Sequence, residues 1–246
     1  MSGGKRIKRQ WCRCQCHSFL THFDMQKYVL ITAGGTGKRM GANRPKQFLL
    51  LNDKPLILHS IDTFLRYDPS IHFVIALPES LQPEWDQICR EYGVHIRYKL
   101  AFGGPARFHS VKSGLKHIPD NALVAVHDAA RPLVTLDVIA RVFNIAEKFG
   151  NAIPVTETAD SVRLTDHSNN SPLPRERIRL VQTPQCFRSE LLKKAYDKNY
   201  TESFTDDATV LEADGSRLYL AEGHRNNIKI TTPTDLIVAK AIIDAK

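Results

Sequence analysis

Residues 28–41 read YVLITAGGTGKRMG, an apolar run that passes into glycines and then into basic side chains. The apolar part, Tyr28–Ile31, predicts a strand, and the glycines predict a tight loop at its carboxyl end. Backbone N–H groups of such a loop can line an anion, and the cations Lys38, Arg39 and Lys46 follow closely. Glycine-rich turns often serve turn geometry alone, but this density of cations favours phosphate binding.

Neither of two familiar phosphate-binding templates fits this loop. In the P-loop pattern G-x-x-x-x-G-K-[ST], Gly37 fits, but the leading glycine falls on Thr32 and the Ser/Thr falls on Arg39. In the dinucleotide pattern G-x-G-x-x-G, the third glycine falls on Met40, and no acidic residue is evident about 20 residues further on. What remains is a glycine loop of neither kind, whose backbone N–H groups could line an anion.

Length and composition indicate one domain. The chain has 246 residues, 42% hydrophobic and 24% charged, which suits a soluble α/β domain with a substantial core. No apolar run approaches the roughly 20 residues of a membrane span. We expect a single domain over residues 25–246 and a cytoplasmic protein whose thiols Cys89 and Cys186 are reduced.

Residues 1–24 differ from the rest in composition. They hold five basic residues and one acid, which is half of the net charge of +8, so the remaining chain is only mildly basic. Cys12, Cys14 and Cys16 do not have the usual zinc spacing, and no apolar core or cleavage site of a signal peptide is present. We expect a disordered leader before the domain, with Met25 as an alternative start. An RNA-binding function would depend on this leader; we expect neither a nucleic-acid nor a membrane partner.

Strand-like and helix-like segments alternate after Met25. The predicted strands cover residues 28–32, 72–77, 95–100, 122–127 and 151–155, and the predicted helices cover 56–65, 81–92, 107–117 and 138–149. This alternation predicts a Rossmann-like α/β fold, with a mostly parallel sheet and helices on both faces. Ligands of such sheets bind at the carboxyl ends of the strands, where the glycine loop lies.

The alternation stops at about residues 156–182, a polar, proline-rich and charged segment that is too long for an ordinary connection. It could be disordered, but SVRL (161–164) and RIRLV (177–181) could also pair as a protruding β-arm, and such arms commonly reach a second subunit. Beyond it we predict helices over 189–196 and from 205, strands over 217–220 and 227–230, and a last helix that begins at TPTD (232–235).

Other chemically suggestive clusters lie near predicted strand ends or in loops. A second glycine turn, GGPARFHS (103–110), opens a helix, and a helix N-terminus of this kind suits an anion or a base edge. HDAARP (127–132) places Asp128 at a strand end, where it is a plausible ligand for magnesium or a hydroxyl group. Taken alone, Asp128 and Arg131 could form a structural ion pair and Lys229 could be a solvated strand residue. Their convergence with the glycine loop favours binding.

From Lys27 to about residue 245, the chain resembles the 2-C-methyl-D-erythritol 4-phosphate cytidylyltransferases of the non-mevalonate isoprenoid pathway. AGGTGKRMG, RPKQF, GGPARFHSV, VHDAARPLV, QTPQCF, FTDDATVLE and NNIKITTPTDL occur in the family's order and at its spacing. HDAARP resembles this family rather than the ribitol-5-phosphate cytidylyltransferases, whose segment is usually less alanine-rich. A nucleotide-sensing module is the non-enzymatic alternative, but it would be expected to lose its catalytic cations.

The resemblance implies a reaction: the substrate phosphate attacks the α-phosphorus of CTP and pyrophosphate leaves, with Mg²⁺ as cofactor. It implies catalytic roles for Arg39, Lys46, Arg175 and Lys229. CTP would contact Ala33, Gly34, Gly35, Gly37, Lys46, Gly104, Ser110, Asp128 and Ala129. Asp128, on this basis, would face the ribose, a metal ion or the substrate hydroxyls.

The resemblance also explains the segment 156–182 as an arm that completes the active site of the partner subunit in a homodimer. Methylerythritol phosphate would contact Asp128, Arg131, Thr158, Arg175, Thr183 and Lys229. Two departures from the family pattern stand out: the arm sequence DHSNNSPLP, and Pro105 at a position that is often polar or acidic.

Overall fold

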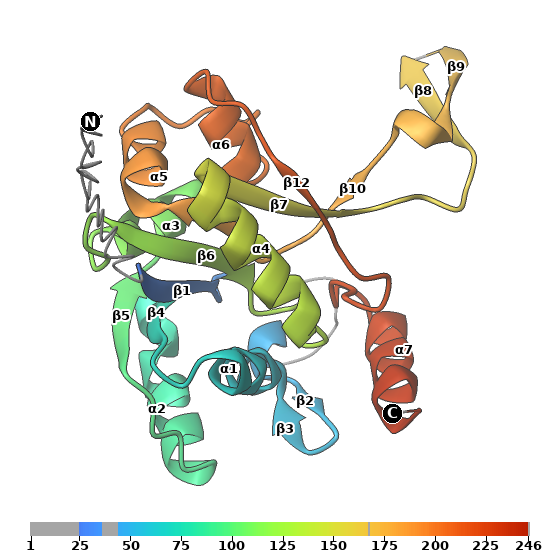
Figure 1. Ribbon diagram of the computed structural model, residues 1–246. Coiled ribbons are helices and arrows are strands. Elements are labelled where there is room, and N and C mark those ends of the chain that lie inside the picture. Colours follow the sequence, from blue (N-terminus) through green and yellow to red (C-terminus); the bar gives the residue numbers. More distant parts are fainter. Residues whose placement is uncertain (1–24, 36–43, 167, 246) are drawn as a thin grey trace, which may run out of the picture.

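The computed structural model describes residues 25–35, 44–166 and 168–245. The predicted leader, and with it Gly37 and Arg39 of the glycine loop, lies outside the described residues. The fold is a central, mostly parallel sheet with helices on both faces (Figure 1), as the sequence predicts.

Strand β1 (Gln26–Thr32) lies inside the sheet. It pairs in parallel with β4 (His72–Leu77) and β6 (Ala122–Asp128), and β4 pairs in parallel with β5 (Tyr98–Phe102). Every residue of β6 is buried, as expected of a strand covered on both faces. The loops that follow β1 and β6 therefore open at the same edge of the sheet.

The other half of the sheet contains its antiparallel pairs. Strand β11 (Gln185–Arg188) lies between β6 and β7 (Asn151–Thr156) and is antiparallel to both. Strand β10 (Leu180–Val181) continues the antiparallel pairing along β7, and β12 (Leu220–Glu222) pairs with β7 in parallel. The sequence pattern did not predict β11.

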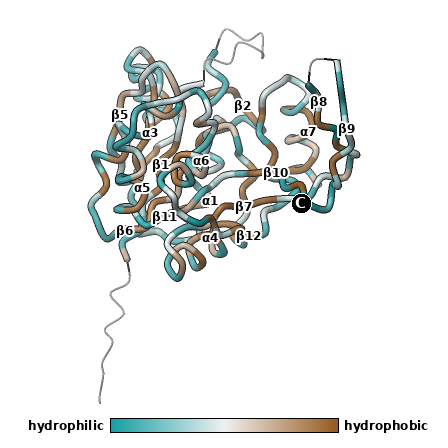
Figure 2. The backbone as a smooth tube through the Cα atoms, turned by 90° about the horizontal axis from the view of Figure 1, so that it is seen from above, coloured by the Kyte–Doolittle hydropathy of each residue, from teal (hydrophilic) through white to brown (hydrophobic). Residues whose placement is uncertain are grey.

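Alternating strand residues divide the core into two layers. On one face, Val29 and Ile31 of β1 pack with the helices α1 (Leu56–Tyr67), α2 (Gln82–Glu91) and α4 (Leu136–Phe149). On the other face, Leu30 packs with α3 (Arg107–Leu115), α5 (Ser189–Tyr196) and α6 (Asp207–Ala213). Figure 2 shows hydrophobic residues along strand β7 and hydrophilic ones over peripheral loops.

A third, smaller cluster of buried hydrophobic residues fixes the last helix to the body of the protein. Helix α7 (Pro233–Asp244) packs against the short hairpin of β2 (Leu50–Leu51) and β3 (Lys54–Pro55). It begins at the predicted TPTD segment, where the side chains of Thr232 and Asp235 form a capping box. The described residues also form short 3₁₀ turns at η2 (Lys46–Phe48), η3 (Glu79–Leu81) and η4 (Arg175–Arg177).

Residues 156–182 do contain a protruding hairpin, but its pairing was predicted wrongly. Strand β8 (Val162–Asp166) pairs with β9 (Asn169–Leu173), whereas Leu180 and Val181 of the RIRLV segment pair with β7. The shorter connection closes the hairpin with less loss of chain entropy. Figure 1 shows this hairpin projecting from the body, and none of the described residues within 157–181 is buried.

Other predicted boundaries also need correction. The strand expected over 95–100 covers Tyr98–Phe102, and the one expected over 217–220 covers Leu220–Glu222. Residues 227–230 do not form a strand. This segment is held instead by single contacts: the buried amide of Asn227 donates to Thr183 O, and Ile230 N donates to Ala130 O.

Candidate active site

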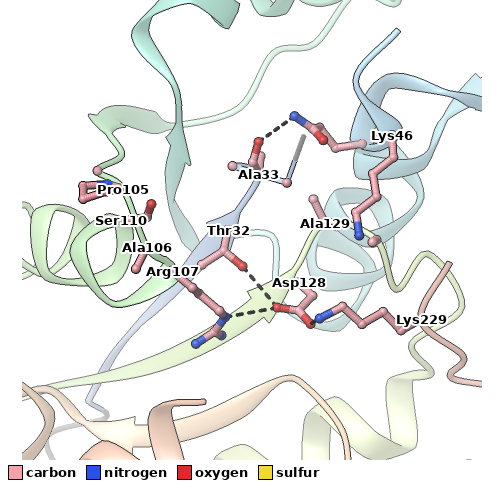
Figure 3. Close-up of a pocket in the computed structure, with 15 residues that line it drawn as sticks. Thr32, Ala33, Lys46, Pro105, Ala106, Arg107, Ser110, Asp128, Ala129 and Lys229 are labelled. Carbon is pink, nitrogen blue, oxygen red and sulfur yellow. Dashed lines mark hydrogen bonds and ion pairs between the residues drawn. The ribbon is translucent and has the colours of Figure 1, made fainter. Parts of the chain in front are cut away.

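A pocket of about 220 Å³ opens where β1 and β6 end and α3 begins (Figure 3). Its walls come from the glycine loop, η2, the second glycine turn, the end of β6 and the segment before α7. Nine predicted site residues line it: Ala33, Gly34, Gly35, Lys46, Gly104, Ser110, Asp128, Ala129 and Lys229.

The two glycine turns approach each other closely around Ser110. A Cβ atom on Gly103 would lie 2.6 Å from Ser110 Oγ, and one on Gly34 would lie 3.7 Å from the same atom. A Cβ atom on Gly35 would lie 3.0 Å from Cε of Lys46. The missing side chain at position 103 thus leaves room for Ser110, and those at positions 34 and 35 leave room in the pocket beside Ser110 and Lys46.

Lys46 reaches the pocket from the short turn η2. The neighbouring Gln47 is buried, and its Nε2 donates to Ala33 O over 2.6 Å. This bond ties η2 to the start of the glycine loop, so the lysine and the loop are fixed relative to one another. A cation and backbone donors held in this way suit a phosphate group.

Asp128 forms the centre of a charged cluster at the end of β6. Its Oδ1 accepts from Thr32 Oγ1 at 3.2 Å and lies 3.4 Å from Arg107 Nε. Its Oδ2 lies 2.8 Å from Lys229 Nζ and 3.9 Å from Arg131 Nε. Burial opposes ionisation, but Arg107 and Lys229 outweigh it and hold the pKa of Asp128 well below its usual range. The carboxylate is therefore ionised at neutral pH.

Two predicted substrate residues, Thr183 and Arg131, are adjacent to Asp128 but are not part of the lining of the pocket. Thr183 is buried, and its Oγ1 accepts from Asp128 N at 3.1 Å. Arg131 donates through Nη1 to Asn227 O at 2.7 Å. In this structure both side chains support the end of β6, and their contact with substrate stays a prediction.

Thr158 and Arg175 lie on the arm and are not among the residues that line the pocket of their own chain. Thr158 Oγ1 accepts from Asp160 N, and Arg175 Nη1 donates to Ala159 O at 2.9 Å. The side chain of Arg175 is 53% exposed. Contact of Thr158 and Arg175 with a substrate in the pocket of a partner subunit remains a prediction.

The surroundings of Asp128 do not favour a protein-held metal ion. Within the described part of the chain, no three His, Cys, Asp or Glu side chains come together to bind one. Both oxygens of Asp128 already face cationic side chains. A divalent ion at this carboxylate would have to displace Lys229, so we derive no step through a metal at Asp128.

Arg107 is a pocket residue to which sequence reasoning gave no role. It is the first residue of α3, and it lines the pocket while contacting Asp128. The signal was present, because Arg107 lies within the quoted GGPARFHS stretch. What could not be read from the sequence was its second partner, Asp207, 100 residues further along the chain.

Comparisons with known proteins give the family. The family model described as 2-C-methyl-D-erythritol 4-phosphate cytidylyltransferase (IspD) matches residues 27–245. The chain belongs to the IspD family. Proteins of that name from Bacteroides thetaiotaomicron and Phocaeicola vulgatus are each 44% identical over 219 residues, which is 89% of this chain and 100% of theirs.

A solved IspD-family structure agrees with the fold. The 2-C-methyl-D-erythritol 4-phosphate cytidylyltransferase from Thermus thermophilus is 31% identical and superposes with a TM-score of 0.72, over 89% of this chain and 100% of that one. Within the described residues, no helix is both long and apolar enough to span a membrane.

Proposed function

We propose that this protein transfers the cytidylyl group of CTP to 2-C-methyl-D-erythritol 4-phosphate and releases pyrophosphate. The observation that carries the proposal is the pocket itself: two glycine turns meet there beside Lys46, Lys229 and Arg107. Membership of the IspD family supports the acceptor and the transferred cytidylyl group, which its relatives' names give, and CTP is the donor that this transfer implies.

The chemistry requires fixed positive charge more than acid–base catalysis. The substrate phosphate attacks the α-phosphorus in line, so both partners are anionic and charge gathers on the α-phosphate oxygens. Cations held beside these oxygens lower the barrier because they need no reorganisation during the step. We assign this role to Lys46 and, from the sequence pattern, to Arg39.

Lys229 and Asp128 form an ion pair, and bound substrates would separate it by giving each side chain a new partner. The side chain of Lys229 is 41% exposed, which leaves it room to turn from Asp128 toward a bound phosphate. Asp128 would then accept hydrogen bonds from sugar hydroxyls, and Thr32 would hold its other oxygen. Ala33, Gly34, Gly35, Gly104, Ser110 and Ala129 would shape the nucleotide site around them.

The arm supports a homodimer in which each subunit completes the other's pocket. It projects from the body (Figure 1), and it exposes Leu164 (59%) and Leu180 (50%). Leu164 lies on the projecting hairpin and Leu180 on the strand β10 at its base, and exposed apolar side chains of this kind gain from burial against another chain. In this arrangement Thr158 and Arg175 would meet the methylerythritol phosphate beside the partner's pocket.

Mg²⁺ and a cytoplasmic location are also part of the proposal. We expect the ion to be held chiefly by the phosphates of CTP, as is common for Mg²⁺. Pyrophosphate release with and without a chelator measures this requirement directly.

The first experiment measures pyrophosphate release from CTP with methylerythritol 4-phosphate or with ribitol 5-phosphate. Release with the first substrate alone supports the proposal. Release with ribitol 5-phosphate alone refutes the substrate but keeps the roles of the cations. A folded protein that binds CTP yet releases nothing with either substrate would be a nucleotide sensor.

A further inference from the structure

Four side chains connect α5 and α6 to the pocket. Tyr196 donates its hydroxyl to Asp207 Oδ1 at 2.7 Å, and Arg107 Nη2 lies 2.7 Å from Asp207 Oδ2. Nε of the same arginine lies 3.4 Å from Asp128 Oδ1. One guanidinium therefore joins a carboxylate in the pocket to a carboxylate behind it.

The far end of this connection is rigid. Asp207 is fully buried and is the first residue of α6, whose capping box with Asp206 fixes the helix start. Tyr196 is also buried and stacks on Phe108 with 4.7 Å between ring centroids. A buried carboxylate needs a cation and hydrogen-bond donors, and Arg107 and Tyr196 supply them.

At the pocket end, the two oxygens of the Asp128 carboxylate are attracted in different directions. Lys229 and Arg131 both lie on the Oδ2 side of Asp128, whereas Arg107 and Thr32 hold Oδ1. Figure 3 shows Arg107 and Lys229 reaching the carboxylate from different directions. Among the described residues, the hydroxyl of Thr32 is the remaining contact of Oδ1 that would resist rotation of the carboxylate toward the two cations if Arg107 were replaced.

We propose that Arg107 is a positioning residue of the transfer reaction: held by Asp207 and Tyr196, it fixes the direction of the Asp128 carboxylate toward the sugar hydroxyls. Arginine suits this role because its planar fork can meet two carboxylates at once, which a lysine ammonium cannot do in the same geometry. Within the FTDDATVLE segment, Asp207 would then serve to hold Arg107 in place. The inference rests on the proposed role of Asp128.

A double-mutant cycle separates this role from simple packing of α3 against α6. The variants are Arg107→Lys and Tyr196→Phe, each made alone and together with Asp128→Asn. Arg107→Lys keeps a positive charge beside Asp207, and Tyr196→Phe removes one hydroxyl. Tyr200→Phe is the matched control, because its ring also packs on Phe108 but is 41% exposed.

We expect Arg107→Lys to lower kcat/KM between about 10- and 100-fold, since small displacements at a reacting centre cost this much. Tyr196→Phe should lower it about 3- to 10-fold, which is less than the full effect of a lost hydrogen bond to a charged group, because the tyrosine acts on Asp128 only through Asp207 and Arg107. In the Asp128→Asn background neither change should have more than about a twofold further effect. Tyr200→Phe should match the wild type.

Losses that multiply in the double variants would overturn the inference, because Arg107 would then act independently of Asp128. Equal losses for Tyr196→Phe and Tyr200→Phe would overturn it too. If Arg107→Lys does not fold, the Tyr196→Phe cycle decides alone. Full activity of Asp128→Asn refutes the assigned role of Asp128 together with the inference, whereas a wild type inactive with both sugar phosphates refutes the proposed function itself.

Discussion

Mild acid should destabilise the protein through His127, one residue before Asp128. Its ring is fully buried; Nε2 lies 3.1 Å from Arg131 O and Nδ1 lies 3.1 Å from Thr183 Oγ1. A carbonyl oxygen only accepts, so the proton sits on Nε2, and Nδ1 accepts from the Thr183 hydroxyl. Burial lowers the pKa of His127 to about 4, which keeps the folded ring neutral.

The magnitude follows from the difference between folded and unfolded chains. An unfolded histidine takes up a proton near pH 6.5, whereas folded His127 does so only near pH 4. The pKa of His127 is lower in the folded chain than in the unfolded chain, so the unfolded chain binds the proton first as the pH falls. The free energy of unfolding is therefore unaffected by this group above about pH 6.5 and decreases as the pH falls toward about 4. At roughly 1.4 kcal/mol per pH unit, the loss is on the order of 3 kcal/mol.

The assay compares the wild type with His127→Gln, which cannot titrate. The free energy of unfolding is measured by denaturant at about pH 7.5 and about pH 4.5, at one fixed protein concentration. The variant loses a constant amount through altered contacts, but its pH dependence should be flatter by roughly 2–3 kcal/mol. The other histidines contribute equally to both proteins. Identical pH dependence would refute the argument.

Three further predictions concern activity and packing. Lys46→Ala should lower turnover roughly 10²–10³-fold with less effect on CTP binding, and an unchanged rate would contradict the cation role. The control Lys54→Ala, which removes a surface ion pair with Asp62, should leave turnover unchanged. Arg175→Ala should impair use of the methylerythritol substrate, and mixing it with Lys46→Ala should restore one intact site per heterodimer; absence of rescue would place the arm in cis. Gly114→Ala should lower the free energy of unfolding by about 1–3 kcal/mol, because its Cβ would lie 2.5 Å from Leu30 Cδ1, and an unchanged melting curve would show that α3 can move away from β1.

Much of the fold could be predicted because its strands and helices have strong local patterns. The buried run over Ala122–Asp128 and the amphipathic α4 are examples, and their order indicates a parallel sheet. The four residues of β11 are too few to show a period, and its place depends on partners from distant parts of the chain. The pairing of Leu180 with β7 was missed for the same reason.

The site was predictable where chemistry lies in one short stretch. Lys46, Ser110, Asp128 and Lys229 each sit in a recognisable segment, and the carboxyl-end rule brings those segments together. The side-chain directions were not predictable, because they depend on tertiary contacts. Thr183, for example, bonds to the backbone of Asp128 behind the pocket.

The place of β11 in the sheet also has a consequence for synthesis on the ribosome. β6 and β7 are complete by Thr156, but the strand that joins them ends only at Arg188. At a synthesis rate of about 5–20 residues per second, β11 is completed on the order of seconds after β7. Throughout that interval the nascent chain carries facing strand edges with unpaired backbone groups. Chaperones that shield such edges should therefore bind ribosome-attached chains ending between β7 and β11 more strongly than chains released at full length.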